Sequence, residues 1–158
     1  MKIAIRYIFI ILSTCALMVS CAKEYSSETP LVPDASWQFS QGALNFAGPI
    51  TSVYSTNGGS SNLLMLTGNS NDGKQAFQIT VYADSIQTGT YKASAYQCSF
   101  IYGSSTNPIY QAGGSYGEEF IVNITKFQSK SVSGNFSGIA QDSAGNSVTI
   151  SNGQFHAQ

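Results

Sequence analysis

The chain has 158 residues, of which 42% are hydrophobic and only 9% are charged, whereas an average soluble domain has roughly 25% charged residues. Low charge together with many Ser, Gly, Asn and Thr residues excludes a coiled coil, a charged helical bundle and an acidic disordered tail. One histidine and three cysteines cannot form the usual zinc sites, which take four cysteines, two cysteines with two histidines, or three histidines. We therefore expect neither a bound metal nor another cofactor.

The first 20 residues have the layout of an export signal. Lys2 and Arg6 precede an apolar run that begins at Tyr7 and ends near Val19. This run of roughly 13 residues is shorter than the ~20 residues that a membrane-spanning helix needs. Residues 1–20 are therefore predicted to be a cleavable signal peptide.

The signal ends in Met18-Val19-Ser20-Cys21, which resembles the lipoprotein box of bacteria. In that family the chain is cleaved before the cysteine, and the thiol and the new amino terminus are acylated with fatty acids such as palmitate. Several acyl chains give a stable anchor, so the resemblance implies a lipoprotein held by Cys21 on the outer membrane, facing the periplasm or the cell exterior. The alternatives are an ordinary secretory signal and a box at Cys15, where the preceding Thr14 is a poor cleavage residue.

Cleavage would leave a chain with five lysines, eight acidic residues and no arginine, which gives a net charge of −3. Without arginine or a basic patch, nucleic acid and anionic membrane surfaces are poor partners. The expected membrane contact is therefore the lipid anchor. With Cys21 acylated, Cys98 would be the remaining thiol, and we expect it to be a small buried hydrophobe rather than a reactive group.

Residues 21–35 are predicted to be the lipidated cysteine and an extended tether, since they include Pro30, Pro33 and several polar residues. Residues 36–158 are predicted to form one β domain, because their short apolar stretches are separated by Gly, Asn, Ser and Asp and show no long helical stripe. Eleven candidate strands follow in chain order. They are Trp37 to Phe39, Leu44 to Phe46, Ile50 to Tyr54, Leu63 to Thr67, Gln75 to Tyr82, Gly89 to Lys92, Tyr96 to Tyr102, Ile109 to Gln111, Glu118 to Lys126, Ser131 to Ala140 and Ser147 to Phe155.

Apolar and polar residues alternate most clearly from Gln75 to Tyr82, which is typical of an antiparallel sheet with one buried and one wet face. The sequence predicts an all-β fold, a single up-and-down antiparallel sheet that forms a β-sandwich or a lipocalin-like (calycin-like) β-barrel of about 8–11 strands. Asp72-Gly73 is predicted to form a type I′ hairpin turn. Gly134, Gly138 and Gly153 indicate bulges or tight coiling of such a barrel.

Four segments of the C-terminal half form a series of strand motifs. They are Gly89-Thr90-Tyr91, Phe120 to Phe127, Val132 to Gly138 and Gly145 to Phe155. The series resembles a family of Bacteroidetes lipoproteins of unknown function, in which a G-x-Y strand precedes V-x-I-T, (I/V)-S-G-x-F and closing (V/I)-x-I-x-x-G-x-F strands. The resemblance covers roughly Trp37 to Phe155. It implies an all-β, calycin-like or sandwich domain, and it offers no catalytic residue.

Acid–base catalysis has few candidates. Glu118 and Glu119 are neighbours on a predicted strand, so their side chains point to opposite faces and cannot both serve one site. Glu118 is the candidate for a hydrolase at a barrel mouth, with a solvated strand-end acid as the alternative. His156 lies in the short tail after Phe155, which is a poor place for a positioned base. The chain is therefore predicted not to be an enzyme.

Six tyrosines lie within one 35-residue stretch. They are Tyr82, Tyr91, Tyr96, Tyr102, Tyr110 and Tyr116. Because tyrosine combines a flat apolar ring with a polar tip, these residues are candidates for stacking on sugars or lining a pocket. The alternative is cross-strand aromatic pairing within the sheet. Trp37, the single tryptophan, is expected to plug the core.

The sequence thus predicts a non-catalytic binding or accessory module for a glycan, a small ligand or a partner protein. A carrier of an apolar molecule inside the barrel is the alternative, and a hydrolase that uses Glu118 is a more remote one. Asp84-Ser85-Ile86 and Asp142-Ser143-Ala144 resemble O-glycosylation sites of Bacteroidetes. Ser85 and Ser143 are therefore candidates for modification.

Overall fold

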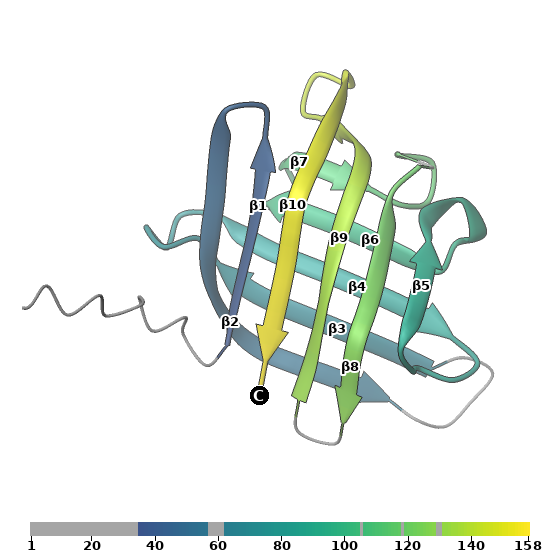
Figure 1. Cartoon of the computed structure of the whole chain (residues 1–158). Coiled ribbons are helices and arrows are strands. Elements are labelled where there is room, and N and C mark those ends of the chain that lie inside the picture. The colour runs from purple at the N-terminus through teal and green to yellow at the C-terminus, as the bar shows by residue number, and fades with distance from the viewer. Residues whose placement is uncertain (1–34, 57–61, 105, 118, 129–130) are drawn as a thin grey trace, which may run out of the picture. The chain divides into compact units, whose positions relative to one another are not determined.

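The computed structural model describes residues 35–56, 62–104, 106–117, 119–128 and 131–158 (Figure 1). The predicted signal peptide, Cys21 and nearly all of the predicted tether lie outside these residues. Within them the chain forms ten strands and one short 3-10 helix. They are β1 (Ser36–Gln41), β2 (Leu44–Thr56), β3 (Asn62–Asn69), β4 (Ala76–Ala83), β5 (Gly89–Lys92), η1 (Ala93–Ala95), β6 (Cys98–Gly103), β7 (Pro108–Ala112), β8 (Ile121–Gln128), β9 (Ser131–Asp142) and β10 (Ser147–Ala157).

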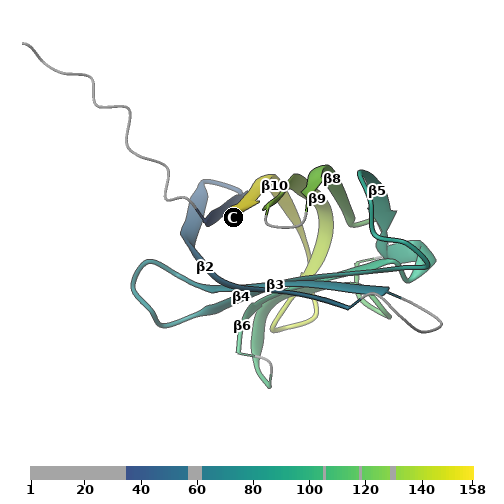
Figure 2. The same cartoon turned by 90° about the horizontal axis from the view of Figure 1, so that it is seen from below.

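Eight of the strands close an antiparallel barrel. Their order is β10-β1-β2-β3-β4-β6-β7-β9, and β9 also pairs with β10. Two further strands extend this sheet, because β8 pairs with β9 and β5 pairs with β8. Figure 1 shows the strands of one layer crossing those of the other steeply, and Figure 2 shows the two layers edge-on. The predicted all-β antiparallel fold is confirmed, and of the two predicted forms it is the barrel.

The predicted simple up-and-down order is wrong at two places. After β4 the chain leaves the barrel wall and forms β5, which pairs with β8. The neighbour of β4 in the wall is therefore β6 rather than β5. The strands β7 and β8 share one edge of β9. β7 pairs only with Gln141 and Asp142, and β8 pairs with residues 131–137. Alternation along a strand identifies its buried face but not its neighbour, so this branching was not readable from the sequence.

Two predicted strands, Leu44 to Phe46 and Ile50 to Tyr54, form the single strand β2. Its first part pairs with β1 and its second part with β3, and the change occurs at Gly48-Pro49. A Cβ on Gly48 would lie 1.8 Å from the Asn69 carbonyl oxygen and 3.0 Å from Cζ2 of Trp37. The Gly-Pro pair is therefore the corner at which the strand passes from one layer to the other, not a strand end.

The turn at Asp72-Gly73 is not of the predicted type I′, since only Gly73 has a positive φ, at 70°. The Gly73 N–H donates to the Ser70 carbonyl, and the Asp72 carboxylate accepts from the Ser70 hydroxyl and the Lys74 N–H. The Ser70 hydrogen bond is the main cause that lowers the pKa of Asp72. The hydrogen bonds of the Asp72 carboxylate hold a turn that has one positive φ, whereas a type I′ turn needs two.

The barrel interior is packed with aromatic rings. Trp37 is 2% exposed and stacks on Phe77 with ring centroids 4.4 Å apart, so the prediction that it plugs the core is confirmed. Further buried rings are those of Phe39, Phe100, Tyr102, Phe120, Phe136 and Phe155. Gly134 and Gly153 face the Phe155 and Phe136 rings, where a Cβ would come within 2.5 Å of ring carbon. The register shift between Ile150 and Gly153 confirms the predicted bulge there.

Cys98 belongs to this core. It is 2% exposed, and its thiol donates to the Tyr91 carbonyl oxygen at 3.3 Å. Burial raises the pKa of the Cys98 thiol to about 12. The expectation of a buried cysteine is confirmed. Because the thiolate is the reactive form, the raised pKa predicts a thiol of low reactivity.

Candidate functional site

The six clustered tyrosines separate into two groups of three. Tyr91, Tyr102 and Tyr110 are at most 9% exposed and point into the core. The second group is exposed, with 43% for Tyr82, 76% for Tyr96 and 44% for Tyr116. The cluster therefore divides by burial into three core tyrosines and three surface tyrosines.

The buried tyrosines have partners for their rings and their hydroxyls. Tyr102 and Tyr110 are directly opposite on β6 and β7, with stacked rings 6.2 Å apart, which confirms cross-strand pairing for these two. Tyr102 bonds to Ser70, and the Tyr110 hydroxyl donates to Gln41 at 3.5 Å. The Tyr91 hydroxyl donates to the carbonyl of residue 87 at 2.8 Å and accepts from the N–H of the same residue at 3.0 Å. Burial is the main cause that raises the pKa of Tyr102 and of Tyr110.

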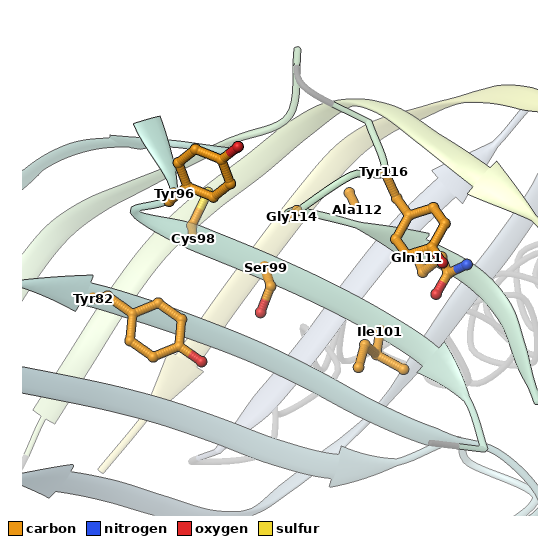
Figure 3. A pocket seen from close by; sticks show the side chains of 10 residues that line it. Tyr82, Tyr96, Cys98, Ser99, Ile101, Gln111, Ala112, Gly114 and Tyr116 are labelled. Atoms are coloured by element: carbon orange, nitrogen blue, oxygen red, sulfur yellow. The ribbon is translucent and has the colours of Figure 1, made fainter. Parts of the chain in front are cut away.

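The exposed tyrosines surround a pocket of about 360 Å³ on the outer face of the barrel (Figure 3). Ser99 and Ile101 alternate along β6 with buried residues, so they face outward and form the middle of the pocket. In Figure 3 Tyr82 lies on one side of Ser99, and Tyr116 with Gln111 lies on the other. The principal lining side chains are those of Tyr82, Tyr96, Ser99, Ile101, Gln111 and Tyr116.

The backbone fixes where each exposed tyrosine stands. Tyr82, near the end of β4, donates its N–H to the Gln97 carbonyl at 2.8 Å. Tyr96 ends η1 in the left-handed conformation, at φ 55° and ψ 26°, and donates its N–H to the Ala93 carbonyl. Tyr116 closes a tight turn that begins at Gly113, where φ is 102° and a Cβ would lie 2.7 Å from the Cys98 carbonyl oxygen. A left-handed tyrosine is unusual and costs about 1 kcal/mol or more, which the surrounding structure has to offset.

The polar groups of the pocket lack protein partners. Among the described residues, no hydrogen bond satisfies the hydroxyls of the three exposed tyrosines, the Ser99 hydroxyl or the Gln111 side-chain amide. Nor does any of the three tyrosine rings stack on another described ring. Five polar groups and three rings thus line one pocket without a hydrogen bond or ring contact to other described residues.

Charge and metal ligands are missing from the same place. None of the described residues that line the pocket carries a charged side chain. Across the described ranges, no three His, Cys, Asp or Glu side chains come close enough together to hold a metal ion. Ser99 and Gln111 were not singled out by sequence, although each lies one position from a buried residue and so had to face outward.

A second polar surface lies on the other layer of the barrel. A row of amide and hydroxyl side chains runs across five adjacent strands. It consists of Thr90, Asn123, Asn135, Gln154 and Gln38. Neighbours in this row bond to each other, since Thr90 donates to Asn123 at 3.4 Å and Gln38 donates to Gln154 at 3.3 Å. The row has no aromatic member, so it offers no stacking surface.

His156 has a better defined position than the sequence suggested. It lies inside β10, directly opposite Ser133 of β9, and Nδ1 of its ring is 2.6 Å from the Ser133 hydroxyl oxygen. Nε2 of the ring is 2.9 Å from the Gln158 amide. The prediction that His156 lies in a tail after the last strand is wrong, because Phe155 and Ala157 both face the core and β10 continues to Ala157. As a cross-strand pair without a carboxylate partner, it resembles ordinary sheet pairing.

Two of the remaining sequence candidates, Ser85 and Ser143, do not line the pocket. Glu118 and Cys21 lie outside the described residues. Ser85 and Ser143 are exposed, Ser85 in the bend after β4 and Ser143 in the turn between β9 and β10. The Asp142 carboxylate organises that turn by accepting from the N–H groups of Ala144 and Asn146.

Comparisons with family models, with curated proteins and with solved structures find no match to this chain. The resemblance to Bacteroidetes lipoproteins therefore stays a prediction. In the part of the chain that the structure describes, no helix has the length and hydrophobicity needed to cross a bilayer.

Proposed function

We propose that the chain is a non-catalytic binding or accessory module, anchored to the outer membrane through Cys21, whose ligand occupies the pocket of Tyr82, Tyr96 and Tyr116. The ligand is a glycan, a small molecule or a segment of a partner protein. One observation carries the proposal, namely that five unpartnered polar groups converge with three unstacked rings on a wall of the barrel. Binding sites commonly combine apolar ring surface with a few polar groups on a rigid scaffold.

A ligand screen on the full chain tests this proposal. A glycan array and a thermal-shift screen of small molecules should find at least one saturable ligand, and Tyr96→Ala should weaken its binding by about ten-fold. Gln154→Ala, a change in the amide row of the other layer, is the matched control and should keep the binding. If Gln154→Ala weakened binding and Tyr96→Ala did not, the ligand would bind at the amide row and not in the pocket, which would contradict the proposal.

The carrier of an apolar molecule is less well supported. A carrier needs an open interior, and the described core residues fill that space with rings such as Trp37, Phe100 and Phe136. Mass spectrometry of the native protein should therefore find no co-purifying lipid apart from the covalent anchor. A stoichiometric apolar molecule would favour the carrier.

The anchor is proposed from the sequence, so it needs its own test. Cys21→Ser should move the protein from the membrane fraction to the soluble fraction, because the acyl chains would be lost. Membrane retention of this variant would contradict the lipid anchor without affecting the proposal for the pocket.

A further inference from the structure

We infer that the pocket of Tyr82, Tyr96 and Tyr116 takes the terminal, uncharged sugar unit of a glycan. This inference rests on the proposed function and makes it specific. Four properties of the pocket match the chemistry of a neutral pyranose ring. They are its polar groups, its aromatic rings, its lack of charge among the described residues and its size.

The polar groups select a ligand that both donates and accepts hydrogen bonds. Each free hydroxyl of the pocket has one donor and two acceptor positions, and the Gln111 amide offers two donors and one acceptor oxygen. Sugar hydroxyls also donate and accept, so they can satisfy every one of these groups. An apolar molecule would bury them unpaired, which costs roughly 1–3 kcal/mol for each group.

The rings select a ligand with an apolar face. Tyr96 is 76% exposed, although its left-handed backbone is a conformation that tyrosine rarely adopts. The fold thus holds a large ring in water without packing it. A pyranose ring has a face of C–H groups that suits such stacking, while its hydroxyls lie at the rim and reach toward Ser99 and Gln111.

The described lining residues carry no charge, which disfavours ionic ligands. A carboxylate or phosphate in this pocket would lose hydration without meeting a lysine or arginine, and an ammonium group would find no carboxylate among the lining residues. Uronic acids, sialic acids and phosphorylated sugars are therefore disfavoured.

The size of the pocket favours a chain end over a long polymer. About 360 Å³ lies near the lower limit of the roughly 300–1,000 Å³ of ligand pockets. Gly113 lies close against β6, since a Cβ there would come within 2.8 Å of Cα and Cβ of Ser99, which leaves little space beside Ser99. A proline-rich peptide also stacks on tyrosines, but its proline carbonyls only accept, which would leave the acceptor oxygens of Gln111 and Ser99 unused.

Calorimetric titration of the full chain tests the inference. The probes are the methyl glycosides of glucose, galactose, mannose and N-acetylglucosamine, the disaccharides cellobiose, maltose and lactose, the methyl glycosides of glucuronic and galacturonic acid, and a decaproline peptide. At least one neutral sugar should bind saturably, and a uronic acid should bind at least about ten-fold more weakly than the neutral sugar of the same configuration. Tyr96→Ala and Gln111→Ala should each lower the affinity for the neutral sugar by about ten-fold, and Gln154→Ala should change it by less than about two-fold.

Other results would overturn the inference in distinguishable ways. Equal binding of a neutral sugar and its uronic acid would contradict the neutral ligand. Binding of decaproline that depends on Tyr96, with no sugar bound, would replace the sugar by a peptide and leave the proposed binding module standing. If no probe binds and the ligand screen of the full chain is also empty, the inference and the proposed function fail together.

Discussion

The two groups of tyrosines show how one residue type serves two purposes in this barrel. In the core, Tyr102 and Tyr110 stack on each other and bond to their neighbours, so both ends of each side chain contribute to stability. At the pocket, Tyr96 and Tyr116 have neither a stacked ring nor a bonded hydroxyl among the described residues. The difference indicates that the exposed group is not required for folding, which leaves its rings and hydroxyls available to a ligand.

The largest expected contrast is between Tyr102→Ala and Tyr96→Ala. Removing the buried ring leaves a cavity, and we expect the free energy of unfolding to fall by about 3–5 kcal/mol. The exposed ring leaves none, so Tyr96→Ala should change stability by no more than about 0.5 kcal/mol. Urea titrations of both variants measure this, and equal losses would contradict the division into two groups.

Alkaline pH should destabilise the core. The unfolded chain releases the Cys98 proton near the ordinary pKa of 9.0, whereas the native state retains it up to a pKa of about 12. Between these values the native state binds more protons, so stability is fully present below pH 9 and falls as the pH rises. The raised pKa values of Tyr102 and Tyr110 act in the same direction above pH 10.

Urea midpoints measured from pH 8 to pH 11 test this dependence, and Cys98→Ala should reduce its slope. The native thiol should also resist alkylation at pH 8 until the protein is unfolded. Rapid alkylation of the folded protein would contradict the burial of Cys98.

Removal of a single tyrosine hydroxyl should also affect the stability of the buried and the exposed tyrosines differently. Tyr91→Phe removes the group that bonds to both the N–H and the carbonyl of residue 87, and we expect a loss of about 1 kcal/mol. Tyr116→Phe removes a hydroxyl without a protein partner, so the free energy of unfolding should stay within about 0.5 kcal/mol of the original. A larger loss of stability in Tyr116→Phe would show that the Tyr116 hydroxyl stabilises the fold, which would contradict its assignment to the pocket.

One expected effect on stability has the opposite sign. Tyr96→Asn puts a residue that tolerates the left-handed conformation at φ 55°, so stability should rise by up to about 1 kcal/mol while the affinity for sugar falls by about ten-fold. Thermal unfolding measures the first change and calorimetry the second. A loss of stability would mean that the Tyr96 ring packs more firmly than its exposure indicates.

Much of the fold was predictable because alternation reports directly which face of a strand is buried. Gln75 to Tyr82 became β4 with Phe77, Ile79 and Val81 inward, as the pattern predicted. Gly48-Pro49 was misinterpreted, since the same two residues that end one strand can bend another at a barrel corner. The displacement of β5 depends on pairing between distant strands, about which local pattern says nothing.

The candidate site was predictable only in part. The tyrosine cluster was visible in the sequence, but its division was not, because Tyr96 and Tyr116 are placed by η1 and by a glycine turn rather than by strand alternation. Tyr82 and Tyr102 differ for a simpler reason, since each follows the alternation of its own strand. Ser99 and Gln111 became meaningful only when β6 and β7 brought them between the tyrosines.

The proposed binding function is tested most directly by where a ligand binds. Backbone amide NMR shifts, followed while a neutral sugar from the panel is titrated into the ¹⁵N-labelled chain, locate the binding surface residue by residue. We predict shifts concentrated at residues 82, 96–101 and 111–116, with Asn135 and Gln154 on the other layer unchanged. Shifts centred on the amide row of Asn123, Asn135 and Gln154, with Tyr96 and Gly113 unaffected, would contradict it.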